Sequence, residues 1–235
     1  EMKLPGLNQV QVMSDIGLTF ASALRSILRQ DPDIIMIGEI RDDETARIAV
    51  RASITGHLVL STIHTNNSLN TIERLLDMDV ERYLLGTALT GIISQRLAKK
   101  LCPKCRQARP VTKYEKIVFK KALNIDVNEI YDPVGCKDCI NGYKGRIAVH
   151  EVLEINQDIR DAIVNSVHKE ELRKLVYDKG DVSSMLQDGL MKVVNGDTSF
   201  EEILNIIDVE EDFGDDDSEL KAALLGKYKE QEAID

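Results

Sequence analysis

The sequence predicts an α/β protein built around a parallel sheet, from three observations. Short apolar runs alternate with amphipathic segments over the first hundred residues. One run, IIMIG at 34–38, is rich in isoleucine and lacks helical periodicity, which is typical of a strand buried on both faces of a parallel sheet. The resulting order of strand, helix, strand, helix, strand, helix favours right-handed crossovers between parallel strands.

Two elements are predicted before that run. The segment LNQVQV at 7–12 alternates polar with apolar residues and predicts a strand. Thr19 is a suitable N-cap for a helix over 20–30, whose leucine and isoleucine residues share one face. Pro32 ends this helix, because the residue before a proline disfavours the helical conformation.

A helix and a second strand follow the run. Asp42 and Asp43 predict the start of a helix over 44–53, because negative charges are stabilising at a helix amino terminus. A Thr-Gly pair ends this helix, and HLVLSTIH at 57–64 predicts another buried strand.

The remaining segments are mainly helical in pattern. Ser68 predicts the N-cap of a helix over 71–78, and an apolar-periodic helix continues from there to about Lys100. The segment GRIAVHEVLEI at 145–155 predicts one more strand, followed by short helices that end near Ile207.

We therefore expect four parts. Residues 1–101 form the sheet-based core, 102–145 a cysteine-bounded insert, 146–207 a mostly helical carboxyl-terminal subdomain and 208–235 an acidic tail. The tail holds eleven acids and three lysines, so it carries −8 of the formal net charge of −10. Because such a block repels itself, we expect disorder followed by one helix, with docking on a basic partner as the alternative.

Composition limits the class of protein. At 235 residues and 43% hydrophobic content the chain can bury a good core, and no apolar run approaches the ~20 residues that a membrane span needs. The first residues lack the basic-then-apolar pattern of a signal peptide, which predicts a cytoplasmic protein. They also lack an initiator methionine, so we expect a piece of a longer protein.

Glu39 directly follows the first buried strand. The carboxyl ends of parallel strands meet at one edge of a sheet, where α/β proteins bind their ligands. This acid is therefore placed like the Walker B acid of a nucleotide hydrolase, which acts on Mg²⁺ or on the attacking water. The alternative is a surface carboxylate with no role in binding.

Two histidines flank the second strand. His64 follows it and is expected at the same edge as Glu39, whereas His57 precedes it and is expected at the opposite edge. A lone histidine near a strand end is usually a satisfied surface or core group, and that alternative stays open.

The four cysteines form two pairs, Cys102 with Cys105 and Cys136 with Cys139. Two-residue spacing lets both sulfurs of a pair face one point, and two such pairs complete the tetrahedron of a structural Zn²⁺ site. Disulfides are the alternative, but a cytoplasmic protein keeps its thiols reduced. A redox site would normally use a single pair.

The cysteines lie in a basic stretch. Residues 96–121 hold ten Lys or Arg against the single acid Glu115, and we expect part of this charge to offset the thiolates. A nucleic-acid surface is the alternative. The only aromatic residues of the stretch, Tyr114 and Phe119, are too few for a row of stacking platforms.

Together these motifs resemble a known family. RQDPDIIMIGEIRDDETARIAVRASITGHLVLSTIHTNNS at 29–68, followed by ISQRLAKKLCPKC at 93–105, resembles the secretion ATPases that drive type II secretion and type IV pilus assembly. The acid block, the histidine box and the tetracysteine insert occur in the family's order. The resemblance covers roughly residues 1 to 207, and the acidic tail departs from it.

The resemblance implies a RecA-like, hexameric motor that hydrolyses ATP with Mg²⁺ at subunit boundaries. Glu39 would be the Walker B acid and His64 the residue that senses the γ-phosphate, with Arg41 and His57 as further candidates for nucleotide contact. Arginines that could reach phosphates or a neighbouring subunit are Arg41, Arg47 and Arg51. The parent protein would act at the inner face of the plasma membrane on the platform protein of a pilus or secretion machine, without nucleic acid.

The family also carries a G-x-x-x-x-G-K-[ST] loop that holds the phosphates, and this sequence has none. Glu1 and Met2 resemble the end of the family's acidic box, so we expect the loop in a preceding part of the parent. We therefore predict ATP-driven pilus assembly for the parent, with type II secretion as the alternative, and no hydrolysis by this chain alone. A zinc-stabilised protein-interaction module is the second hypothesis, from a different class.

Overall fold

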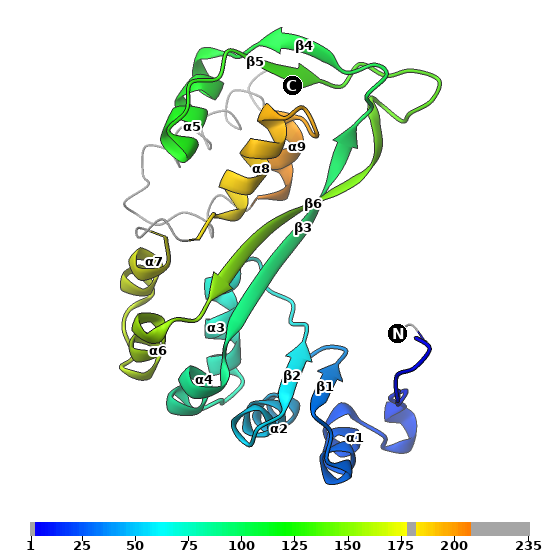
Figure 1. The fold of residues 1–235 in the computed structure, drawn as a ribbon, viewed down its shortest axis with the longest axis vertical. Helices are drawn as coiled ribbons and strands as arrows, with labels where there is room; N and C mark the ends of the chain where they lie inside the picture. Colours follow the sequence, from blue (N-terminus) through cyan, green and yellow to red (C-terminus); the bar gives the residue numbers. More distant parts are fainter. Residues whose placement is uncertain (1–2, 178–181, 208–235) are drawn as a thin grey trace. The chain divides into compact units, whose positions relative to one another are not determined.

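The computed structural model describes residues 3–177 and 182–207 (Figure 1). By its internal contacts the chain divides into two compact units. The first comprises Glu1–Thr65, Leu69–Ile92 and Glu154–Leu172, and the second Asn66–Ser68, Ile93–Leu153 and Arg173–Asp235. The acidic tail predicted at 208–235 lies outside the described residues. No helix within 3–177 or 182–207 has the length and apolar content that a membrane span requires.

The first unit combines a two-stranded sheet with helices. Its elements in chain order are η1 (Ser14–Ile16), α1 (Phe20–Ile27), η2 (Leu28–Gln30), β1 (Ile34–Ile37), α2 (Asp43–Ile54), β2 (Leu58–Ser61), α3 (Ser68–Asp77), α4 (Arg82–Ala88), α6 (Gln157–Val164) and α7 (Lys169–Tyr177). The first residue of α3 and the last five of α7 belong to the second unit. β1 and β2 are parallel, with Ile34 opposite Leu58 and Ile37 opposite Ser61. The predicted parallel pair of strands with a helix between them is therefore present.

Polar caps begin the first two helices where the sequence predicts them. Before α1, the side chains of Thr19 and Ser22 each accept a hydrogen bond from the other residue's backbone N–H, forming a capping box. Before α2, the Asp42 carboxylate accepts from the backbone N–H of Thr45 at 2.8 Å and from its hydroxyl at 2.9 Å. Each such cap stabilises its helix by about 1 kcal/mol.

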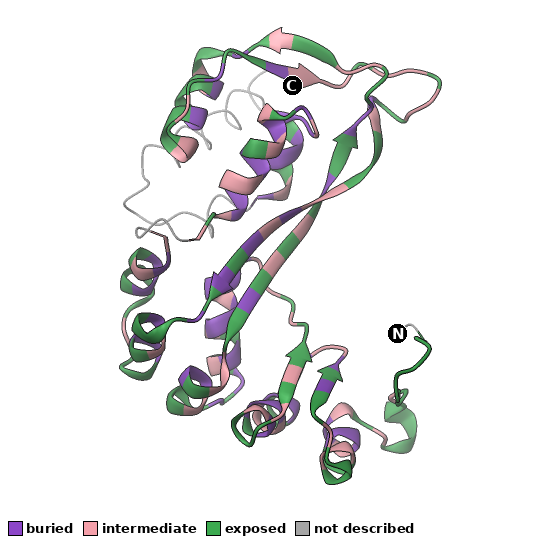
Figure 2. Cartoon of the chain, viewed as in Figure 1, coloured by how far each residue is buried: buried purple, intermediate pink, exposed green. Residues whose placement is uncertain are grey.

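The β1–β2 sheet is covered on one face only, so the prediction of burial on both faces is wrong. α2 packs against β2, and alternate residues of β1 are buried. On the other face Ile34 is 63% and Met36 71% exposed. Figure 2 shows both strands of this sheet with exposed segments, drawn in green. The register places these side chains beside the exposed Leu58 and Leu60, so the four form one apolar surface, which we call the bare sheet face.

The strand predicted at 7–12 is also wrong. Residues 8–12 have no regular secondary structure, and Leu7 and Val10 are exposed. A strand is stable only with a hydrogen-bonded neighbour, and the strands of the described residues pair as β1–β2, β3–β6 and β4–β5, without this segment.

The second unit is built on paired strands and a helical core. Its elements are β3 (Gly91–Leu101), β4 (Gln107–Pro110), α5 (Lys113–Leu123), β5 (Glu129–Asp132), β6 (Tyr143–Glu154), α8 (Met185–Val194) and α9 (Phe200–Ile206). β3 pairs with β6, and β4 runs antiparallel to β5 (Figure 1). Phe119 of α5 and Phe200 of α9 are fully buried in the core cluster, with ring centroids 5.7 Å apart. The predicted strand and short helices after residue 145 are confirmed.

The helix predicted to continue to about Lys100 is wrong beyond Ala88. The chain forms β3 instead, and its burial has the two-residue period of a strand, since Ile92 and Ala98 are buried while Ile93 and Leu97 are exposed. The pair of β-branched isoleucines favours this conformation. Pairing with β6, far along the chain, then overrides a local pattern that also fits a helix.

The prediction that Ser68 is the N-cap of this helix is wrong, because Ser68 is the first residue of α3 itself. Its backbone N–H donates to the Glu151 carboxylate at 3.1 Å, and its hydroxyl lies 3.1 Å from that of Ser94. Glu151 is buried and also accepts from the Tyr177 hydroxyl at 2.9 Å. A distant carboxylate therefore takes the role predicted for the serine side chain.

An ion-pair network joins α5 to the β4–β5 hairpin. The Arg109 guanidinium donates to both Glu115 oxygens, at 2.7 and 2.6 Å, and through Nε to Asp132 at 2.5 Å. Burial alone would raise the pKa of Glu115, but hydrogen bonds from Arg109 and from the Thr112 backbone outweigh it and hold that pKa below its ordinary value. Glu115 is therefore a buried, ionised and fully paired carboxylate.

Candidate functional site

Glu39 and His64 meet at one edge of the β1–β2 sheet. Glu39 lies two residues beyond β1, and His64 three residues beyond β2. Because the strands are parallel, their carboxyl ends share an edge, and His64 Nε2 lies 3.2 Å from Glu39 Oε2. The juxtaposition expected from the sequence is thus present in the structure.

Thr62 fixes the spacing of the two chain segments that carry these residues. The backbone N–H of Ile40 donates to the Thr62 carbonyl at 2.9 Å, which extends the parallel ladder beyond the strands. The Thr62 hydroxyl donates to the Gly38 carbonyl at 2.7 Å. Sequence reasoning missed Thr62, although a hydroxyl residue just past a strand and two positions before His64 was a usable signal.

Arg41 completes the cluster. Its guanidinium lies 2.5 Å from Glu39 Oε1, so each carboxylate oxygen of Glu39 has a partner. The Glu39 side chain is 12% exposed, against 69% for Arg41 and 87% for His64. The hydrogen bond from Arg41 is the largest influence on the pKa of Glu39 and lowers it. Burial acts in the opposite direction, and the Arg41 charge and His64 add to the lowering. The cluster presents an ionised acid with two exposed nitrogen donors around it.

The other sequence candidates do not join this cluster. His57 precedes β2 at the opposite edge, and its Nδ1 lies 2.9 Å from the Ala52 carbonyl at the end of α2. Arg47 forms an ion pair with Asp43, and Arg51 lies 3.9 Å from a Glu81 oxygen. Of the three arginines considered, Arg41 is the one that contacts Glu39.

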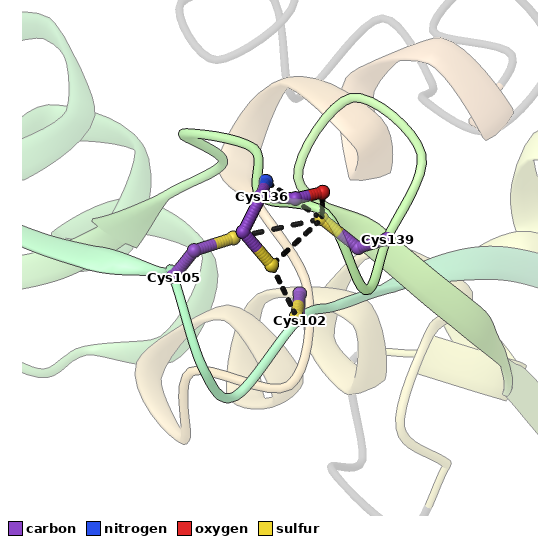
Figure 3. Close-up of side chains that lie close together, drawn as sticks. All are labelled: Cys102, Cys105, Cys136 and Cys139. Carbon is purple, nitrogen blue, oxygen red and sulfur yellow. Dashed lines mark hydrogen bonds between the residues drawn. The ribbon is translucent and has the colours of Figure 1, made fainter.

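The four cysteines gather around one point in the second unit (Figure 3). The measured Sγ–Sγ distances are 4.0 Å for Cys102–Cys136, 3.7 Å for Cys105–Cys139 and 3.6 Å for Cys136–Cys139. A tetrahedron with Zn–S bonds of about 2.3 Å has edges of about 3.8 Å, whereas a disulfide requires about 2.05 Å. All four thiols are free. The arrangement therefore fits a single four-coordinate metal ion and not two disulfides.

Tight turns shape the two loops that carry these thiols. The Cys102 carbonyl accepts from the backbone N–H of Cys105 at 3.3 Å, and the Cys136 carbonyl from that of Cys139 at 3.2 Å. After the second pair the chain reverses at Gly142, whose φ of +82° and close approach to Pro133 leave no room for a Cβ. We call these two cysteine loops the knuckles.

The thiols differ in their electrostatics. Burial raises the pKa of Cys105 to about 12. Burial acts in the same direction on Cys139, but hydrogen bonds from the Cys136 backbone and side chain and from other neighbours lower its pKa to about 7. Bound metal would favour the thiolate form of every ligand.

Several basic residues of the stretch 96–121 have acidic partners away from the thiols, so only part of its charge is left to offset the thiolates. Lys99 bonds Glu202, Lys100 lies near Asp197, Arg109 bonds Glu115 and Asp132, and Lys120 bonds Asp126. Lys104 is on the knuckles, and its bond to Asp138 at 2.6 Å ties one knuckle to the other. These partners also leave less positive charge for a nucleic-acid surface.

These features define a class: a mixed α/β protein with an acid and a histidine at the carboxyl edge of parallel strands, and a separate four-cysteine cluster. The family model described as "Type II/IV secretion system protein" matches residues 1–205. The chain therefore belongs to the type II/IV secretion system protein family, as the sequence motifs indicate.

Relatives come from both branches of the family. The chain is 47% identical over 207 residues to "Putative type II secretion system protein E" of Escherichia coli (strain K12), covering 88% of this chain and 41% of that protein. It is 44% identical over 207 residues to "Type IV pilus assembly ATPase PilB" of Myxococcus xanthus (strain DK1622), covering 87% of this chain and 36% of that protein. The chain thus spans less than half the length of these relatives, which do not separate secretion from pilus assembly.

Solved structures show the same fold. The pilus retraction motor PilT with bound ADP matches with a TM-score of 0.56 and 30% identity, over 82% of this chain and 45% of that one. The Legionella pneumophila ATPase DotB matches with a TM-score of 0.54 and 24% identity, over 80% of this chain and 42% of that one. This likeness concerns the fold alone.

Proposed function

We propose that this chain is the carboxyl-terminal portion of a secretion-family motor whose full-length form hydrolyses ATP, with Glu39 and His64 as catalytic residues of a RecA-like core. The contact between His64 Nε2 and Glu39 Oε2, at 3.2 Å on the carboxyl edge of parallel strands, is the observation that carries the proposal. That edge is where ligands bind in doubly wound α/β folds.

Each residue has a distinct task in this mechanism. Glu39, kept ionised by Arg41, holds the divalent cation or orients the attacking water. Exposed His64 donates Nε2–H to Glu39 before nucleotide binds and is free to turn to the terminal phosphate afterwards. Bound Mg²⁺ would supply the positive charge that phosphoryl transfer requires. Arg41 is an exposed donor for phosphate oxygens, and His57 remains the weaker candidate because it caps α2.

The four thiols hold a structural Zn²⁺ in this proposal. Their spacing matches the edge of a zinc–thiolate tetrahedron, and a closed set of four sulfurs leaves no open position for chemistry. Within the proposed domain plan, residues 1–101 carry the nucleotide edge, 102–145 the zinc insert and 146–207 the carboxyl-terminal subdomain.

The full-length protein would work as a homo-hexamer on the membrane platform of its machine, in the cytoplasm. A ring of identical subunits needs a heterologous interface, in which one face of a subunit meets a different face of the next. Type IV pilus assembly is our proposed role, from the character of the carboxyl-terminal sequence, and type II secretion is the alternative. Deleting the gene and scoring surface pili against secreted enzymes separates the two.

The central test is ATP hydrolysis by the full-length parent. Glu39→Gln should lower turnover about 10²-fold or more, because misplaced cation or water forfeits electrostatic stabilisation of the transition state. Asp43→Asn, which neutralises an exposed acid of α2, is the matched control and should leave turnover nearly unchanged. The 235-residue chain, without the phosphate-binding loop, should show no turnover. A Glu39→Gln parent as active as the Asp43→Asn parent would refute the assignment.

A zinc-stabilised interaction module is the second candidate function for this polypeptide by itself. It is favoured by the second unit, which has its own buried core and four-thiol cluster and does not contain the Glu39 site. Under this alternative, the full-length protein with Cys139→Ser would lose binding of its partner. The full-length protein with Glu39→Gln would keep that binding.

A further inference from the structure

A two-residue hairpin turn closes the second knuckle. Asn141 and Gly142 have φ angles of +50° and +82°. The residues on either side of them, Ile140 and Tyr143, exchange backbone hydrogen bonds at 3.1 and 2.9 Å. Positive φ at both central residues defines a type I′ turn, for which Asn-Gly is a preferred sequence. Because Asn141 is exposed and Gly142 is buried, the turn presents an asparagine amide to water directly before a glycine.

An Asn-Gly pair carries a reaction of its own. The glycine nitrogen forms a bond to the side-chain carbonyl carbon of the asparagine, and the carbon–nitrogen bond of the side-chain amide breaks. The displaced nitrogen leaves as ammonia with the proton that the glycine nitrogen loses. Water then opens the cyclic imide to aspartate or to isoaspartate, in which the main chain runs through the side chain. Glycine favours this attack because it has no Cβ to hinder it.

The folded turn holds the pair in an unreactive geometry. Ring closure requires the Gly142 nitrogen on the same side of the Cα–C bond as the Asn141 Cβ. A type I′ turn gives its first central residue a ψ of about +30°, which turns the next nitrogen to the opposite side. Gly142 packs against Pro133 so closely that a Cβ would lie 2.4 Å from the Pro133 Cβ. The peptide therefore cannot rotate while the knuckle stays closed.

The cysteines hold the Gly142 backbone at both of its polar atoms. Its N–H donates to the sulfur of Cys139, and its carbonyl accepts from the backbone N–H of Cys102 at 2.8 Å. These two cysteines come from different knuckles and belong to the four-thiol cluster. The unreactive geometry of the pair thus depends on the same loops that a bound zinc ion would fix.

The sequence contains a second Asn-Gly pair, Asn195 and Gly196, at the end of α8. Asn195 is in the helical region, with φ −72° and ψ −8°, and the Gly196 N–H donates to the Val193 carbonyl at 2.9 Å. This glycine N–H is held by a helix end, in place of a thiol. The two pairs have the same chemistry and different anchors, so the second is an internal control for the first.

We propose that Asn141 is a deamidation site that stays unreactive while the four-cysteine cluster holds its metal. Loss of zinc releases the Gly142 backbone, and Asn141 then converts to aspartate and isoaspartate. Isoaspartate lengthens the main chain of the turn by one carbon, so the two-residue hairpin cannot re-form and the loss of metal becomes permanent. The protection rests on the structural zinc proposed above, but it needs neither Glu39 nor ATP.

Ageing of the complete 235-residue chain under reducing conditions, with zinc or with a strong chelator, tests the protection. Peptide mass spectrometry in ¹⁸O-labelled water measures conversion at each pair, because the label enters when the imide opens. Asn141 should convert at least ~tenfold faster with chelator, since a tenfold ratio corresponds to only about 1.4 kcal/mol, far below the binding free energy of a structural zinc site. Asn195 should keep its rate.

The zinc content of the same samples separates the ways in which the proposal can fail. Equal rates at Asn141 in protein that holds zinc and in chelated protein would refute the protection and leave the zinc assignment intact. A reduced protein that takes up no zinc would refute both. Equal acceleration of Asn195 by chelator would also overturn the proposal, because it would mean general unfolding and not release of the knuckle.

A second arm tests whether the loss of metal is permanent. Zinc is restored to the aged protein, zinc-loaded chains are separated from zinc-free chains, and isoaspartate at position 141 is measured in each fraction. It should be several-fold enriched in the zinc-free fraction. Asn141→Asp is the matched control, because it adds the same charge without lengthening the main chain, and it should bind zinc like the wild type. Isoaspartyl chains that bind zinc as fully as Asn141→Asp would refute the permanent loss.

Discussion

The hydroxyl of Thr62 donates a 2.7 Å hydrogen bond to the carbonyl of Gly38, joining the two strand ends just before Glu39 and His64. Because this bond is at the protein surface, we expect its loss to cost only about 1 kcal/mol. Thr62→Val should lower stability by that amount, while Thr62→Ser, which keeps the hydroxyl, should lower it less. Urea denaturation measures both. Destabilisation by Thr62→Val no larger than that by Thr62→Ser would mean that the hydrogen bond contributes no measurable stability.

The four-cysteine cluster should contain zinc. Atomic absorption of reduced protein should find about one zinc per chain, because the sulfur spacing matches a single tetrahedral ion. Since the binding energy of such sites is largely folding energy, a strong chelator should release the ion and remove amide-exchange protection around both knuckles. The strands β1 and β2 of the first unit should keep their protection. A reduced, folded protein without zinc would contradict this assignment.

Gly142 and Gly145 form a matched pair for testing the second knuckle. Their φ angles are +82° and +81°, but a Cβ at Gly142 would lie 2.4 Å from the Pro133 Cβ, whereas one at Gly145 would meet nothing within 4 Å. Gly145→Ala should cost about 1–2 kcal/mol, the strain of a left-handed residue. Gly142→Ala should cost at least about 2 kcal/mol more and weaken zinc retention, because Pro133 and the chain of the knuckle must move. Equal unfolding midpoints would show that the knuckle tolerates this displacement.

The Glu115 network should dominate the acid sensitivity of the second unit. The lowered pKa of Glu115 means that its stabilisation is complete above the ordinary glutamate pKa of about 4.5 and is lost as the pH falls through the lower folded value. Glu115→Gln should destabilise the protein by about 2–3 kcal/mol at neutral pH, because Arg109 then loses a charged partner. Below pH 4 the difference from wild type should shrink. Unfolding curves recorded between pH 3 and pH 7 measure this.

Asp126→Asn is the control for that experiment. Its ion pair with Lys120 is highly exposed, so the change should be within about 0.5 kcal/mol at every pH. If the two variants have the same pH profile, the acid sensitivity does not come from the buried network.

The meeting of Glu39 and His64 was predictable because it depends only on strand direction. Two short apolar runs separated by one helix form parallel strands, and residues just past parallel strands share an edge. The cysteine cluster was predictable for a similar reason, since two-residue spacing constrains each pair locally. In both cases the chemistry follows from short stretches of sequence.

The errors arise where distant pairing decides the structure. Residues 91–101 fit a helix locally, but β6 provides a strand partner that no local pattern reveals. Ser68 resembles a cap, yet Glu151, far along the sequence, takes its N–H. The positioning bond of Thr62 was also missed, because its acceptor is a backbone carbonyl just past β1, which any residue type could provide.

The bare sheet face has a practical consequence for anyone handling this polypeptide. Ile34, Met36, Leu58 and Leu60 expose a contiguous aliphatic surface that water wets poorly, and such surfaces draw copies of a protein together. The formal charge of −10 opposes that approach through mutual repulsion, which dissolved salt weakens. Concentrated samples should therefore stay clear in dilute buffer and become turbid as sodium chloride is added, the reverse of ordinary salting-in.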